Sequence, residues 1–290
     1  MKNCWMFKSD PPCFILGGRA GDIIQMLPCF LEIHRRTSLK PTVMSSSEFV
    51  NIYDGVSYVT PYSIPENWWK MIPKAKQIAQ ELFGGGAVVQ FWHTKPTGGD
   101  EIGADPRGFA TLQCHEENHG VNMALDPDYG TSMARRCGFS REEWVGLPLV
   151  FDRRSIGREA ELAKSVIGAE KRPVILYNFK ARTVGFPFMP EVINPIMQRY
   201  GRHFRLVDIG NVSAHRIFDL LGLYDRAVGF ITADTATAHL AVGSKVPAIW
   251  FTVPDWRGSV PRGNCVWHCK YSEILGKIEE IMQVVESWKT

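Results

Sequence analysis

Residues 228–252 have the sequence VGFITADTATAHLAVGSKVPAIWFT, and this stretch decides how the fold is interpreted. The apolar run Val228–Thr232 is typical of a buried strand, and Val246–Phe251 is typical of another. Between them, Asp234 is a natural N-cap, and a short helix is expected to open on Thr235. Because the first N–H groups of a helix have no partner inside the helix, a phosphate can bind at this turn. A purely structural alternative is that Asp234 only caps the helix.

A second strand, turn and helix are predicted near the N-terminus. Cys13–Leu16 is a short apolar run, and apolar residues recur at helical spacing from Ile23 onward. The turn between them contains glycines that let the backbone approach a ligand closely. These glycines are Gly17, Gly18 and Gly21, and Asp22 follows them. The turn lacks the G-x-G-x-x-G order of a dinucleotide site and the Gly-Lys-Ser/Thr of a P-loop.

Taken together, the two segments resemble the heptosyltransferase-like family of GT-B glycosyltransferases. That family opens with a strand, then Gly-Asp, then a helix containing Leu-Pro; here these are Gly21-Asp22 and Leu27-Pro28. Its second half carries Asp-Thr-Gly-x-x-His before a buried strand, and Asp234-Thr235-Ala236-Thr237-Ala238-His239 matches it. The family also has a strand followed by a basic loop, and here Lys180 and Arg182 follow the apolar run at 173–177. The order and spacing fit over most of the chain.

The chain departs from the family pattern at three places. Ala236 stands where the family usually has glycine, and Phe188-Met189-Pro190 replaces the Trp-Pro of the family. No acidic residue for the ribose hydroxyls is obvious after Val207-Asp208-Ile209-Gly210-Asn211. The identity of the donor nucleotide is therefore left open by the sequence.

The alternation of predicted strands and helices indicates an α/β protein with parallel sheets. The resemblance implies a GT-B arrangement, in which two Rossmann-like domains face a central cleft. We expect an acceptor-side domain at 1–150 and a nucleotide-sugar-binding domain at 151–290. The resemblance also leads us to expect that the last helix, Ser272–Trp288, crosses back to the first domain.

Composition is that of an ordinary globular protein, with 45% hydrophobic and 22% charged residues among 290. The net charge of +3 offers no bulk electrostatic case for nucleic-acid binding. No signal peptide and no membrane span is predicted. The seven cysteines are an odd number without a secretion signal, which favours free thiols and a cytoplasmic location.

Two short motifs offer competing metal hypotheses. His115, Glu116 and His119 match H-E-x-x-H, the pattern of a zinc hydrolase on a helix. Their flanks lack an apolar stripe and no third ligand follows, so a polar loop is favoured. Cys265-Val266-Trp267-His268-Cys269 lacks a partner C-x-x-C, so a structural strand or loop is favoured there. We expect no metal at either place.

The resemblance implies transfer of a sugar from a nucleotide-diphosphate sugar to a hydroxyl acceptor. Asp22 is the candidate general base, with helix capping as its structural alternative. Lys180 and Arg182 are candidates to neutralise the diphosphate. The turn at Asp234 would contribute N–H groups and hydroxyls, with His239 steadying it or the phosphate; its contributors are Thr235, Ala236 and Thr237. No cofactor is required, because a helix dipole and basic side chains can neutralise the leaving group.

Two matters stay open at this stage. The acceptor is a saccharide such as lipopolysaccharide core, or a hydroxylated DNA base of phage type. The segment 92–130, rich in His and Asn, is the place where acceptor choice is expected to be determined. The alternatives to transfer are a non-catalytic nucleotide-sugar-binding protein and, less favoured, the zinc hydrolase.

Overall fold

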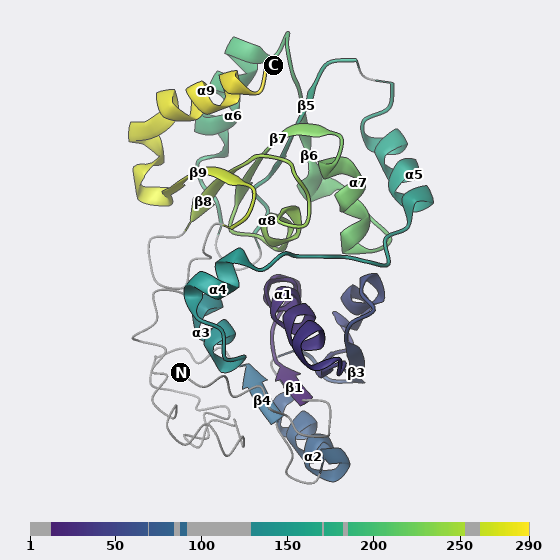
Figure 1. Ribbon diagram of the computed structural model, residues 1–290. Coiled ribbons are helices and arrows are strands. Elements are labelled where there is room, and N and C mark those ends of the chain that lie inside the picture. Colours follow the sequence, from purple (N-terminus) through teal and green to yellow (C-terminus); the bar gives the residue numbers. More distant parts are fainter. Residues whose placement is uncertain are drawn as a thin grey trace. The chain divides into compact units, whose positions relative to one another are not determined.

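The computed structural model describes residues 13–68, 70–83, 88–91, 129–169, 171–181, 185–252 and 262–289. The chain divides into two compact units, Met1–Arg153 and Arg154–Thr290. Each unit is built around its own parallel sheet (Figure 1). No helix among the described residues is long and apolar enough to cross a membrane.

The first unit contains a four-stranded parallel sheet in the order β3-β2-β1-β4. Its strands are β1 (Cys13–Leu16), β2 (Thr42–Ser46), β3 (Thr60–Ile64) and β4 (Val88–Phe91). Its helices are α1 (Ala20–Thr37), η1 (Val50–Gly55), α2 (Ile72–Phe83), α3 (Tyr129–Arg136) and α4 (Arg141–Gly146). The apolar residues at 56–60 of the sequence predict a strand there, but the strand β3 begins only at Thr60. This edge strand is largely exposed, so the buried apolar residues just before it gave the stronger pattern.

Side chains of β1 alternate between two packed faces, as the period of a strand requires. Cys13 and Ile15 pack in one cluster with residues of α2 such as Ile72. Phe14 points the other way, and its ring lies 5.1 Å from that of Phe30 on α1. Helices therefore cover both faces of this sheet, which explains why β1 is apolar at every position.

The second unit contains a five-stranded parallel sheet in the order β6-β5-β7-β8-β9. Its strands are β5 (Val174–Asn178), β6 (Arg205–Asp208), β7 (Ala227–Ala233), β8 (Ala248–Thr252) and β9 (Cys265–Lys270). Its α-helices are α5 (Ile156–Val166), α6 (Met189–Tyr200), α7 (Leu221–Tyr224), α8 (Ala236–Ala241) and α9 (Ile278–Ser287). Short 3₁₀ helices are η3 (Ile209–Asn211), η4 (Ile217–Leu220) and η5 (Tyr271–Lys277).

Helix α9 packs against α6 within this second unit (Figure 1). Its buried residues Ile281, Met282 and Val285 join the core cluster that includes Ile231 of β7. Trp288 lies directly against Gly229, where an added Cβ would come within 2.1 Å of Cε3 of the indole. The apolar stripe of α9 is thus buried inside its own unit, and the crossing of the last helix to the first unit stays a prediction.

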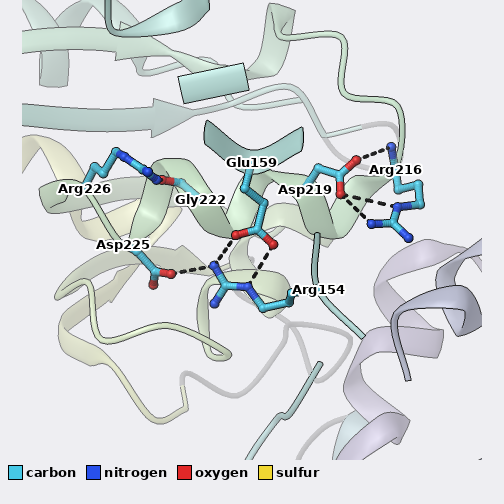
Figure 2. Close-up of polar contacts among 7 residues, drawn as sticks. All are labelled: Arg154, Glu159, Arg216, Asp219, Gly222, Asp225 and Arg226. Atoms are coloured by element: carbon cyan, nitrogen blue, oxygen red, sulfur yellow. Dashed lines mark hydrogen bonds and ion pairs between the residues drawn. The ribbon is translucent and has the colours of Figure 1, made fainter. Parts of the chain in front are cut away.

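A network of ion pairs fixes the beginning of the second unit (Figure 2). Arg154 donates from Nε to Oε1 of Glu159 at 2.9 Å and from Nη2 to its Oε2 at 2.6 Å. The same Nη2 donates to Oδ2 of Asp225 at 2.6 Å. A second buried carboxylate, that of Asp219, accepts from Nη2 of Arg216 at 2.9 Å. Arg158 of α5 also lies with its Nε 3.5 Å from Oδ2 of Asp219. Because buried carboxylates are costly without partners, these ion pairs tie α5 to η4 and to Asp225 just after α7.

Candidate functional site

In the first unit, the turn after β1 places Asp22 in the first turn of α1, half-buried. Its Oδ2 accepts a 2.7 Å hydrogen bond from the backbone N–H of Arg19, so Asp22 does cap its own helix. The turn is tight at Gly18, where an added Cβ would lie 2.7 Å from both Cβ and Oδ2 of Asp22. Gly17 is buried and Gly21 half-buried in the same turn. A carboxylate can accept several hydrogen bonds, so capping does not exclude a second role.

Arg19 is a residue of this turn that the sequence pattern did not single out. Its guanidinium carbon lies 4.9 Å from the ring centroid of Trp68, a cation–π distance. Arg19 therefore places a cation in the turn that carries Asp22. The proximity of Trp68 could not be read from the sequence, because this contact joins positions almost fifty residues apart.

In the second unit, the turn after β7 differs from the prediction in its cap. The N-cap of α8 is Thr235, which has extended backbone and accepts a hydrogen bond at Oγ1 from the N–H of Ala238 at 3.2 Å. The prediction that Asp234 caps this helix is therefore wrong. Thr and Asp are both good N-cap residues, and strand β7 extends to Ala233, which moves the helix start one residue further.

Buried polar side chains form hydrogen bonds that support this turn from inside the second unit. The hydroxyl oxygens of Thr235 and Thr237 lie 2.7 Å apart, and Nδ2 of Asn178 donates to Thr237 Oγ1 at 2.7 Å. Thr232 Oγ1 donates to the carbonyl of Asn178 at 3.1 Å. The hydroxyls of Thr235 and Thr237, which were expected to contribute to phosphate binding, are thus hydrogen-bonded to buried groups of the protein itself. The backbone N–H groups of Ala236 and Thr237 have no hydrogen-bond acceptor among the described residues, so they are the donors that this turn has left for a ligand.

Because Thr235 takes over the cap, Asp234 is directed toward another partner. Its Oδ1 lies 3.5 Å from Nε2 of His239, a ring that is only 5% exposed. The imidazole in turn lies edge-on to Trp250, with ring centroids 5.3 Å apart. His239 therefore contacts the turn from within the protein, and its role in steadying the turn or the phosphate stays a prediction.

Lys180 lies in the loop after β5. Its backbone N–H donates to Oδ1 of Asn178 at 2.8 Å, and its Nζ contacts Oδ1 of Asn211. The side chain is exposed, so its charge is presented at the surface of the unit. Arg182, the second predicted cation, lies outside the described residues.

The carboxylate at the end of β6, that of Asp208, is bound within its own turn. Both oxygens of Asp208 are used locally: Oδ1 accepts from the N–H of Gly210 at 2.8 Å and Oδ2 from Nδ2 of Asn211 at 2.7 Å. Asp208 thereby caps η3. What this strand end presents toward Lys180 is the amide of Asn211.

These groups meet because parallel strands end at one edge of a sheet. The strands β6, β5 and β7 are neighbours, and the residues at or just after their carboxyl ends include Asp208, Lys180 and Asp234. The bond from Asn178 to Thr237 joins the end of β5 directly to α8. Such edges are where open α/β sheets bind ligands. The structure therefore places Lys180 and the turn at Asp234 at the same edge of the second sheet.

Tyr271 is a further residue of this edge that the sequence reasoning missed. Its ring is 7% exposed, and its buried hydroxyl lies beside Asp234 without a hydrogen bond of standard geometry to any described residue. Burial, with the charge of the Asp234 carboxylate as the next cause, raises the pKa of Tyr271 to about 12. The phenol is therefore a neutral potential donor at physiological pH.

The two metal hypotheses fare differently. The residues of the first, His115, Glu116 and His119, lie outside the described residues. Cys265–Lys270 forms strand β9, in agreement with the structural interpretation of that segment. Cys265 and Cys269 lie on one face of the strand and the exposed His268 on the other. Both cysteines are free thiols, as are Cys13, Cys29 and Cys137.

No protein-family model matches the sequence, and no curated protein matches it significantly. Solved structures do. A glycosyl transferase of family 9 from Veillonella parvula has a TM-score of 0.59 at 10% identity, with 97% of both chains covered. The structure described as E. coli ADP-heptose lps heptosyltransferase II has a TM-score of 0.59 at 10% identity, covering 95% of this chain and 99% of that one.

A third structure is the iron-containing dodecameric glycosyltransferase TibC of enterotoxigenic E. coli. It has a TM-score of 0.54 at 11% identity and covers 97% of this chain and 78% of that one. The likeness shows the fold. The chain has the α/β fold of these glycosyltransferases, with one parallel sheet in each unit, so the predicted GT-B class is confirmed.

Proposed function

We propose that this chain is a glycosyltransferase that moves a sugar from a nucleotide-diphosphate sugar to a hydroxyl acceptor. The observation that carries the proposal is the meeting of Lys180 with the turn at Asp234 on one edge of the second sheet. That edge combines an exposed cation with the N–H groups of a helix start, which suits a diphosphate. The same fold occurs in structures described as glycosyltransferases, one of them in complex with ADP-D-β-D-heptose.

In this proposal the second unit holds the donor. Lys180 and the N–H groups of Ala236 and Thr237 neutralise the diphosphate, with Arg182 as a second cation. These groups stabilise the charge that develops on the leaving nucleoside diphosphate as the bond from the anomeric carbon to the phosphate oxygen breaks. His239 holds Asp234 in place beneath the same turn.

The first unit supplies the general base. Asp22 takes the proton of the acceptor hydroxyl while the acceptor oxygen attacks the anomeric carbon, and the electron pair of the broken bond leaves with the diphosphate. The N–H of Arg19 orients the carboxylate through its 2.7 Å bond to Oδ2. This scheme requires no metal ion and no cofactor.

The acceptor in this proposal is a saccharide, for which lipopolysaccharide core is the leading example. Support comes from the description of the E. coli structure as a lipopolysaccharide heptosyltransferase. A hydroxylated DNA base is the other acceptor to test. The location we propose for the reaction is the cytoplasm, consistent with the free thiols of the five described cysteines.

The test is a panel of radiolabelled nucleotide sugars, ADP- and UDP-linked, incubated with the protein and with either core oligosaccharide or hydroxymethylated DNA. We expect release of the nucleoside diphosphate and transfer of label to the oligosaccharide. Label in the DNA instead would show that the acceptor is a hydroxylated base and not a saccharide. Binding of a nucleotide sugar without turnover would favour the non-catalytic alternative.

Elemental analysis of the purified protein tests the metal-free scheme separately. One zinc per chain that is lost together with activity when His115 and His119 are replaced by alanine would overturn the transferase proposal in favour of a hydrolase.

A further inference from the structure

Four aromatic rings, those of Phe179, Phe186, Phe251 and Tyr271, form a cluster at the carboxyl edge of the second sheet. Phe186 lies at its centre. Its ring is stacked on Phe179 with centroids 4.4 Å apart and planes 11° apart, and on Phe251 at 5.2 Å and 25°. Tyr271 meets the same ring edge-on at 5.1 Å and 82°. We call these four residues the aromatic cluster.

Two members of the aromatic cluster stand at the two ends of the loop that carries Lys180. Phe179 directly precedes Lys180, and Phe186 follows the loop before α6 begins. The stack with Phe186 fixes the position of Phe179, the residue directly before Lys180. A fixed neighbour restricts the backbone of Lys180 and so limits where its side chain can lie.

The other two members connect this stack to the donor turn. Phe251 lies near the carboxyl end of β8, the strand next to β7. Tyr271 lies beside Asp234, the first residue after β7. Phe186 thus touches, directly or through one ring, both pieces of the proposed diphosphate site: the loop of Lys180 and the turn at Asp234.

We propose that Phe186 is a positioning residue of the donor site: its ring, stacked on Phe179, holds Lys180 near the turn at Asp234 and so sets the affinity for the diphosphate. The expected effect on diphosphate affinity rests on the proposed function. The expected effect on the order of the segment around Lys180 does not. Phe186 is half-buried and packs mostly on other rings. A purely structural phenylalanine would change global stability and leave loop order and affinity alone.

The experiment compares Phe186→Leu with a matched control, Phe188→Leu. Phe188 lies in the same segment, is also half-buried and touches Phe186 edge-on at 6.0 Å, but it contacts neither Phe179 nor the turn at Asp234 among the ring pairs of the structure. Phe186→Tyr keeps the ring and serves as the conservative rescue. Each variant is checked for its melting temperature.

The first measurement is amide hydrogen exchange of the unliganded protein over peptides that span 179–186 and 233–239. We expect faster exchange of both peptides in Phe186→Leu, unchanged exchange in Phe188→Leu and near-native exchange in Phe186→Tyr. This measurement needs no ligand, so it decides the ordering role of Phe186 even if the proposed function is wrong. Equal exchange in the two leucine variants would overturn the proposal.

The second measurement is calorimetric binding of ADP, UDP and inorganic pyrophosphate. For the probes that bind the native protein, we expect Phe186→Leu to weaken binding about 3- to 10-fold, the effect of losing one aromatic pair. Pyrophosphate should weaken as much as the nucleotides. Weaker nucleotide binding with unchanged pyrophosphate binding and unchanged exchange would mean that Phe186 touches the base itself, which overturns a positioning role. Failure of all three probes to bind the native protein would count against the proposed function alone.

Discussion

The turn after β1 and the turn after β7 are built from the same plan, a buried strand that leads through a short turn into a helix, yet they use their aspartates differently. In the first, Asp22 lies inside the helix and accepts from the N–H of Arg19, the residue before the helix. In the second, Thr235 caps the helix, and Asp234 stands outside it, 3.5 Å from His239.

The comparison teaches that a cap residue decides what a neighbouring carboxylate can do. Where Thr235 satisfies the N–H of Ala238, the charge of Asp234 is left for an imidazole and for Tyr271. Where no such residue precedes the helix, Asp22 must serve as its own cap and also as the proposed base. In the first turn one side chain, Asp22, both caps the helix and is the proposed base. In the second turn Thr235 caps the helix, and the carboxylate of Asp234 contacts His239 instead.

The largest expected effect is on catalysis, from Asp22→Asn. Asparagine can still accept the hydrogen bond from Arg19, so the cap is kept while the base is removed. We expect kcat to fall by about 10²–10⁴, the usual range for a general base, with nucleoside diphosphate affinity almost unchanged. Steady-state kinetics and calorimetry measure the two quantities.

The matched control for that prediction is Asp54→Asn, an exposed aspartate of the same unit, which should leave kcat unchanged. Normal turnover by Asp22→Asn would remove Asp22 from the catalytic role and leave it as a cap only. The two turns would then be alike in having purely structural caps.

The next effect is on donor binding, from Lys180→Gln. Losing one charge-assisted contact costs about 1.5–3 kcal/mol, so we expect the Kd for a nucleoside diphosphate to rise about 10- to 100-fold. Lys164→Gln, an exposed lysine of α5, should have no effect. Unchanged binding in Lys180→Gln would show that Lys180 does not take part in binding the diphosphate, even though it lies at the same sheet edge as the turn at Asp234.

A third test concerns the tightness of the first turn. In Gly18→Ala the new Cβ would lie 2.7 Å from Cβ and Oδ2 of Asp22, so the carboxylate or the turn must move. We expect the free energy of unfolding to fall by about 1–3 kcal/mol, measured by urea denaturation. Gly157→Ala, where no atom lies within 4 Å of the added Cβ, should not destabilise the protein. Equal stability of the two variants would show that the turn has room.

The smallest effect distinguishes the two roles within the second turn. Thr235→Val keeps the shape of the side chain but removes the hydroxyl that caps α8, and it should cost about 1–2 kcal/mol of unfolding free energy. Asp234→Asn should cost less than about 1 kcal/mol, because Asp234 is not the cap. Thr235→Ser should restore most of the stability. A larger loss from Asp234→Asn than from Thr235→Val would reverse the assignment of the cap.

Much of the fold was predictable from the sequence, because parallel strands covered on both faces are apolar at nearly every position. Cys13–Leu16 is buried throughout, and so is most of β7. The glycines before Asp22 and the small residues after Asp234 marked the ends of those strands. Strand β3 was misplaced because it is a largely exposed edge strand in which only Ile64 is buried.

For the candidate site, the sequence by itself determined which chemical groups stand at the carboxyl ends of the strands: Asp22, Lys180 and Asp234. Only the tertiary structure decided which of them share an edge and which side chains support them. Thr235 rather than Asp234 caps α8, Asn178 reaches Thr237 across 59 positions, and Tyr271 lies beside Asp234. These outcomes depend on sheet order and on contacts between distant positions, and local periodicity carries no information about either.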